Sequence, residues 1–81
     1  DYIKRVTEIE NVASSFKGVD KSFAISAGRE VRVIVYPEQV DDATLTILAN
    51  NIAEKIHDTL TYPGTVKVTV MRETRAESVA K

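Results

Sequence analysis

The chain has 81 residues, enough for one small domain or for a piece of a larger protein. Its formal net charge of −1 argues against a module that holds nucleic acid by bulk electrostatics, because such modules are usually clearly basic. It contains no cysteine, which excludes a disulfide framework, a thiolate metal site and a cysteine nucleophile.

The first predicted element is an amphipathic helix between residues 3 and 16. Its apolar residues recur at three- and four-residue spacing, and charged side chains lie between them. Gly18 follows the last apolar residue and should end the helix. The stripe expected to face the core consists of Ile3, Val6, Ile9, Val12, Ala13 and Phe16.

A β-hairpin is predicted next, and the rest of the chain should pack around it. Two runs of alternating apolar residues flank a turn at residues 27–30. The first strand should span about residues 19–27 and the second residues 30–36, where Pro37 ends the ladder because it has no N–H to donate. Since strand side chains alternate between faces, we expect both runs to build one apolar face. The residues expected on that face are Phe23, Ile25, Ala27, Val31, Val33 and Val35.

The second half of the chain predicts a longer helix and a third strand. Asp41 and Asp42 occupy the position of a helix N-cap, where a carboxylate suits the positive end of the helix dipole. Tyr-Pro-Gly at residues 62–64 should break this helix, and alternating valines at residues 66–70 predict the strand. Residues 72–81 remain as a polar end. The helix stripe comprises Leu45, Leu48, Ala49, Ile52, Ala53, Ile56 and Leu60.

These elements predict a small α+β domain that covers residues 1–81. The long helix allows a crossover that places the second and third strands parallel and adjacent. Both helices would then cover the valine face of a three-stranded sheet, which gives an αββαβ two-layer sandwich. This arrangement is close to the ferredoxin-like βαββαβ fold without its first strand. The apolar runs are far too short to span a bilayer, so we expect no membrane contact from this segment.

The sheet face opposite the helices is the first candidate binding surface. It should combine Arg32 and Lys67 with Tyr36, and sheets that carry cations and aromatics hold single-stranded RNA in RRM-type domains. Those domains use two or three stacking aromatics, whereas this face offers one, and the chain is nearly neutral. Ile34 and Met71 on the same face suit a protein interface. We therefore favour a protein contact, and expect this segment to bind RNA weakly or not at all.

The hairpin turn is the second candidate. Gly28 and Arg29 would suit a backbone anion nest with an adjacent guanidinium, which is a plausible phosphate contact. An ordinary turn explains the same residues, with Gly28 at positive φ and Arg29 in solvent, and we favour this interpretation. The patterns GxGxxG, GxxxxGK and GxxG do not occur.

No catalytic or metal-binding residue is predicted. His57 and Asp58 are adjacent, but the sequence holds a single histidine, and a metal site needs further ligands from other elements. A serine nucleophile would need the same histidine as its base. We therefore assign no catalytic, cofactor or metal residue, and interpret the segment as not enzymatic by itself.

Four stretches of the sequence resemble the C-terminal end of the ribonuclease Y family. They are GVDKSFAISAGREVRV, VDDATLTILANNIAEKI, YPG and VTVMRETRA, and similar features extend from about residue 2 to residue 81. None of them is a catalytic signature. The resemblance implies that the chain is the C-terminal accessory domain of a larger bacterial endoribonuclease that initiates mRNA decay.

The resemblance also implies the composition of that larger protein. It would have an N-terminal membrane anchor, a coiled coil, a KH RNA-binding domain and an HD nuclease domain that uses a divalent metal. The HD signature would lie upstream, so the adjacent His57 and Asp58 are a coincidence. This segment would be cytoplasmic, in a protein anchored at the cytoplasmic face of the cell membrane.

Two roles for the segment follow from the resemblance. It would dock on the HD catalytic domain or mediate dimerisation, in contact with the HD and KH domains. The alternative is an independent module that positions RNA or recruits a protein through the open sheet face. The residues predicted to contact RNA or protein are Arg29, Arg32, Ile34, Tyr36, Lys67 and Met71.

Overall fold

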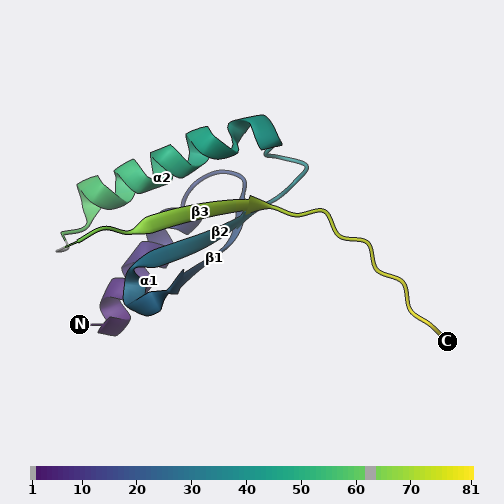
Figure 1. Ribbon diagram of the computed structural model, residues 1–81, viewed down its shortest axis with the longest axis horizontal. Helices are drawn as coiled ribbons and strands as arrows, with labels where there is room; N and C mark the ends of the chain where they lie inside the picture. Colours follow the sequence, from purple (N-terminus) through teal and green to yellow (C-terminus); the bar gives the residue numbers. More distant parts are fainter. Residues whose placement is uncertain (1, 62–63) are drawn as a thin grey trace.

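In the computed structural model, which describes residues 2–61 and 64–81, two α-helices pack on one face of a three-stranded sheet (Figure 1). The predicted α+β fold and its αββαβ order are confirmed. Short 3₁₀ turns at Ser26–Gly28 and Asp42–Thr44 precede the second strand and the second helix. The main elements are α1 (Tyr2–Ser14), β1 (Val19–Ile25), β2 (Glu30–Val35), α2 (Leu45–Thr59) and β3 (Lys67–Arg72).

The sheet has the order β1-β2-β3, with β2 in the centre. β1 and β2 are antiparallel, whereas β2 and β3 are parallel, as a connection through α2 requires. In the parallel ladder Val31 pairs with Val68 and Val33 pairs with Val70. The valines of both strands therefore share the face that lies under the helices.

The hydrophobic core lies between this valine face and the two helices. Ile9 of α1 and Ile52 of α2 are fully buried and pack in one cluster with the fully buried Val31 and Val33 of the central strand. Burial of an aliphatic side chain of this size contributes about 1.5–3 kcal/mol relative to exposure. Among the residues that the structure describes, the buried hydrophobic ones are Ile9, Ala13, Val31, Val33, Val35, Val40, Ile52 and Ile56.

The face predicted for β1 is wrong, and an irregularity at the start of the strand is the reason. Val19 pairs with Val35, but the next pair joins Lys21 to Ile34, so Asp20 is an extra residue in the ladder. One inserted residue turns every later side chain of a strand to the opposite face. The alternation predicted from the sequence is therefore inverted after Asp20.

The inversion moves two large apolar side chains out of the core. Phe23 pairs with Arg32 and Ile25 pairs with Glu30, on the sheet face away from the helices, which we call the open face. Ala27 is not in the strand, because β1 ends at Ile25 and Ala27 lies in the 3₁₀ turn at φ 57°.

Small side chains of β1 face α1 instead. The Ser22 hydroxyl donates to the Glu10 carbonyl at 2.9 Å, and the Ala24 amide donates to the Glu10 carboxylate at 2.9 Å. This carboxylate satisfies an outward-pointing amide on an edge strand, and the small residues allow the helix to lie close.

The connections at the other end of the sheet confirm two predicted signals. The Asp41 carboxylate accepts a hydrogen bond from the Thr44 amide at 3.1 Å, which caps the 3₁₀ turn that leads into α2. Gly18 follows α1 with φ +91°, and a Cβ at this position would lie 2.6 Å from Val40 Cγ2. Gly18 is therefore required both by its backbone angle and by the close approach of Val40.

Two residues of the predicted helix stripes are exposed. Ile3, in the first turn of α1, is 72% exposed, because the core of this helix is centred two turns later at Ile9 and Ala13. Ala53 of α2 is also exposed. Within the predicted break after α2, residues 62–63 lie outside the described residues.

The polar C-terminal end begins later than predicted, because Arg72 belongs to β3. The Arg72 Nε donates to the Val40 carbonyl at 2.7 Å, and Nη2 donates to the Pro37 carbonyl at 2.7 Å. Arg72 therefore ties the end of β3 to the loop that enters α2. Residues 73–81 are exposed and run away from the domain as an extended chain (Figure 1).

Candidate functional surfaces

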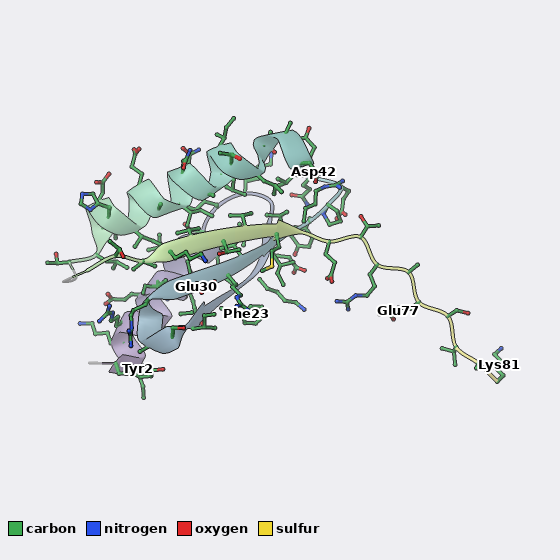
Figure 2. All side chains as sticks on the ribbon, viewed as in Figure 1. Tyr2, Phe23, Glu30, Asp42, Glu77 and Lys81 are labelled. Carbon is green, nitrogen blue, oxygen red and sulfur yellow. The ribbon has the colours of Figure 1, made fainter. Side chains whose placement is uncertain are left out.

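The open face brings together most of the residues predicted to make contacts. The parallel ladder places Ile34 beside Met71 and Arg32 beside Thr69. β1 adds Phe23, which the sequence analysis had placed in the core and which is 46% exposed. Figure 2 marks Phe23 on β1 and Glu30 on the neighbouring strand β2. The open face consists of Lys21, Phe23, Ile25, Glu30, Arg32, Ile34, Lys67, Thr69 and Met71.

The apolar part of the open face is larger than the sequence analysis predicted. Ile34 and Met71 form a pair across β2 and β3, and Phe23 and Ile25 extend the apolar surface onto β1. Both helices lie on the other side of the sheet (Figure 1). An apolar surface that crosses three strands suits contact with a macromolecule.

The charged groups of the open face are partly engaged with one another. The Glu30 carboxylate accepts from Arg32 Nε and from Thr69 Oγ1, each at 3.3 Å. Glu30 therefore offsets the charge of Arg32. Lys67 pairs with Glu30 in the ladder and is exposed, and it forms no ion pair with any residue in the described part of the chain.

Tyr36 lies beyond the last ladder pair of β2, where its amide donates to the Gly18 carbonyl at 2.8 Å. The negative charge of Asp20 and a hydrogen bond between the phenol and the Asp20 carboxylate raise the pKa of Tyr36. The extra residue of β1 thus holds the phenol at the far end of the hairpin. This placement separates Tyr36 from Lys67, which lies at the beginning of β3.

The turn between β1 and β2, where the sequence raised a backbone nest as one interpretation, has a left-handed backbone. Ser26, Ala27 and Gly28 have φ values of 52°, 57° and 82°, so three successive residues are left-handed. The Arg29 amide donates to the Ser26 carbonyl at 3.1 Å, within the turn itself. The amide that a nest would offer to an anion is therefore already occupied, while the Arg29 residue is exposed.

A cavity beside this turn collects residues that are distant in the sequence. Arg5 of α1 and Arg29 of the turn line it together with Ala27, Gly64 and Thr65. Sequence reasoning missed Arg5, because the helix periodicity marks it only as a polar position. The contact appears only in the structure, where a Cβ on Gly28 would lie 3.3 Å from Arg5 Nε.

His57 is exposed on α2. It borders a second hollow whose other walls are mostly apolar, with Ile56, Leu60 and Val66, and which shares Gly64 and Thr65 with the arginine cavity. In residues 2–61 and 64–81, no group of three or more His, Cys, Asp or Glu side chains is arranged to hold a metal ion.

Comparison with known proteins identifies the origin of the segment. The chain is 58% identical over 81 residues to Ribonuclease Y of Latilactobacillus sakei, covering all of this chain and 16% of that protein. It is 56% identical over 80 residues to Ribonuclease Y of Thermoanaerobacter pseudethanolicus and 50% identical over 80 residues to that of Fusobacterium nucleatum. Each of these two matches covers 99% of the chain and 16% of the relative. The chain is homologous to a region of Ribonuclease Y.

The Ribonuclease Y relatives are much longer than this chain, which spans about 16% of their length. No model of a protein family matches the chain, and no solved structure matches it. Neither helix of the described residues is long and apolar enough to cross a membrane.

Proposed function

We propose that this chain is a non-catalytic accessory domain of a Ribonuclease Y-like endoribonuclease, and that its open face docks on the catalytic part of the same protein. The observation that carries the proposal is the apolar surface formed by Phe23, Ile34 and Met71 on a sheet whose other face packs against both helices. The remainder of the protein would supply a KH domain, an HD nuclease domain with its divalent metal, and an anchor at the cytoplasmic face of the membrane.

The non-catalytic role is supported by the distribution of potential catalytic groups. The sequence holds a single histidine, His57, and this side chain lies on the outer part of α2 and not on the open face. The Ser22 hydroxyl, a candidate nucleophile by type, donates to the Glu10 carbonyl and lies beside Ser14 at 2.6 Å. Ser22 thus joins α1 to β1.

The size of the open face favours docking within one protein over pairing of two copies. Three strands about 4.8 Å apart and six residues long, at 3.3 Å per residue, present roughly 300 Å². A stable interface between separate proteins usually buries about 800 Å² on each side. A covalently linked partner is held at high effective concentration, so a smaller surface is sufficient.

The docking partner can be tested by calorimetric titration of this chain into Ribonuclease Y of L. sakei that lacks its homologous segment and its anchor. We expect binding that Ile34→Asp abolishes, because a carboxylate would be buried without a partner. Ile47→Asp is the matched control, since Ile47 is also an exposed isoleucine, 59% exposed on α2. Equal binding by both variants would exclude this interface.

Sedimentation of the chain alone tests the alternative occupant. A concentration-dependent dimer that Ile34→Asp dissociates would show that the partner of the open face is a second copy of the chain and not the catalytic part.

The second candidate function is an RNA-positioning surface on the open face, and the exposed Lys21 and Lys67 favour it. Fluorescence anisotropy of a short single-stranded RNA, at low and at physiological salt, tests this role. Salt-sensitive binding that the double variant Arg32→Glu, Lys67→Glu loses would support it. Unchanged binding by that variant would exclude the open face as the RNA surface.

A further inference from the structure

The side chains of the open face form three rows across the strands, because the two ladders align them in pairs. The first row lies at the end of the sheet where β1 turns into β2, and the third row lies at the far end. Taken in the order β1, β2, β3, the rows are Ile25, Glu30 and Lys67, then Phe23, Arg32 and Thr69, then Lys21, Ile34 and Met71.

An apolar band crosses these rows diagonally. Ile25 and Phe23 begin the band on β1, and Ile34 and Met71 continue it on β2 and β3. Diagonal neighbours on adjacent strands lie about 7–8 Å apart, so a partner that touches Phe23 also reaches Ile34. From Ile25 to Met71 the band extends over two strand spacings and four residues, which is roughly 16 Å.

Two lysines lie on opposite sides of the apolar band. Lys67 occupies the corner of the open face at the turn end of β3, and Lys21 occupies the opposite corner on β1. Both are exposed, and neither forms an ion pair with any residue at positions 2–61 or 64–81. Arg32, between the two corners, already pairs with Glu30 at 3.3 Å. The band therefore has one available positive charge on each side.

A protein segment that covers the apolar band must satisfy its own backbone hydrogen bonds. The band presents apolar side chains, and a buried N–H or C=O group without a partner is costly. An extended segment laid on this face would leave such groups unpaired, whereas an α-helix pairs them internally. About three turns of a helix, at 5.4 Å per turn, match the length of the band. The opposite face of the sheet is covered in the same way, by α1 and α2.

We infer that the open face binds an amphipathic helix of the catalytic part, with acidic residues on both sides of its apolar stripe. This inference rests on the docking role proposed above and specifies the chemistry of the docked segment. The stripe covers the apolar band, and the acidic residues pair with Lys21 and Lys67. Complementary charges on both sides fix the orientation of the helix. α1 and α2 bury their own apolar sides in the core, so the helix comes from outside this chain.

The test uses Ribonuclease Y of L. sakei in which this 81-residue chain replaces the homologous segment, so that the covalent link to the catalytic part is kept. A carbodiimide joins a lysine amine to an adjacent carboxylate as an amide, with loss of water. We expect mass spectrometry to find Lys21 and Lys67 joined to Asp or Glu residues of one helix. These residues should be about two or five positions apart, the spacing across an apolar stripe. Lys55, exposed on α2, is the control and should form no such link.

A photoreactive residue separates this inference from the docking proposal. p-Benzoylphenylalanine in place of Phe23, an exposed aromatic of the band, labels any segment that lies on the open face, whatever its charge. Labelling of the catalytic part without carbodiimide links from Lys21 and Lys67 would preserve docking and overturn the acidic helix. Failure to label the catalytic part would overturn the docking proposal itself.

Charge reversal tests the role of the two lysines. The double variant Lys21→Glu, Lys67→Glu should lower photolabelling of the catalytic part about tenfold, because two attractive charge pairs become repulsive. Lys55→Glu should leave the labelling unchanged, and equal losses in both variants would overturn the inference. Carbodiimide links to a second copy of this chain, or photolabelling of added single-stranded RNA in place of the catalytic part, would also overturn it.

Discussion

The two faces of the sheet have similar apolar side chains and opposite roles. On β2, Val33 is fully buried beneath the helices, while its neighbour Ile34 points to the open face and is partly exposed. On β1 the small Ala24 lies on the helix side and the large Phe23 lies on the open side. The covered face thus holds the domain together, whereas the open face keeps apolar surface that the domain does not use for its own folding.

The largest expected contrast separates the core from the exposed surface of one helix. Ile52→Ala should lower the free energy of unfolding by about 2–5 kcal/mol, because Ile52 is fully buried and the substitution leaves a cavity. Ile47→Ala, on the exposed side of the same helix, should change it by less than about 0.5 kcal/mol. Urea denaturation measures both, and similar losses would contradict the assignment of the two sides.

Substitution of Gly18, at the edge of the covered face, should destabilise the chain about as much as substitution at its centre. Gly18→Ala is expected to cost about 2–3 kcal/mol, since it combines a left-handed backbone with a Cβ 2.6 Å from Val40 Cγ2. Gly64→Ala has a similar φ but no atom within 4 Å of the new Cβ, so only the backbone cost of about 1 kcal/mol should appear. Equal costs in denaturation experiments would show that the Val40 contact is unimportant.

A polar version of the same contrast compares two arginines near the C-terminus. Arg72→Met should cost about 1.5–3 kcal/mol, because its hydrogen bonds to the carbonyls of Pro37 and Val40 are charge-assisted. Arg75→Met should cost less than about 0.5 kcal/mol, as expected for exposed ion pairs. A loss of stability in Arg75→Met, measured by thermal unfolding, would indicate that the extended end packs on the domain.

A substitution in the left-handed turn should have a smaller effect, and it should stabilise the chain where the preceding variants destabilise it. Ala27→Gly is expected to stabilise the chain by about 0.5–1 kcal/mol, because glycine adopts φ 57° without the penalty of a Cβ. Ala24→Gly, in the extended β1 strand, should destabilise it by about 0.5 kcal/mol or more. If urea denaturation shows that both variants change the free energy of unfolding in the same direction, the left-handed geometry of Ala27 would be contradicted.

The smallest effect concerns the extra residue of β1. Asp20 raises the pKa of Tyr36 above its ordinary value of 10.0, so Asp20→Asn should bring this pKa back toward that value. Since the folded-state pKa is the higher one, the contribution of Tyr36 to stability is present below about pH 10 and is lost as the pH rises through the folded-state pKa. NMR titration of the Tyr36 ring measures the shift. An unchanged pKa in Asp20→Asn would show that the Asp20 and Tyr36 side chains do not interact.

Most of the elements were predictable from residue patterns alone. The apolar periodicity of α2, the cap at Asp41 and the glycine after α1 are local signals, and the structure confirms each. The faces of β2 and β3 were also predictable, because their valines alternate regularly. The face of β1 was not, since an extra residue at Asp20 changes the pairing without changing the alternation in the sequence.

The sequence by itself determined the order of the elements, the valine core and the homology to a region of Ribonuclease Y. Tertiary structure alone decided that Phe23 lies outside the core and that Arg5 and Arg29 line the same cavity beside the turn. The physical reason is the range of the interactions. Periodicity and capping act within a few residues, whereas strand register and the convergence of charges depend on how distant segments pack.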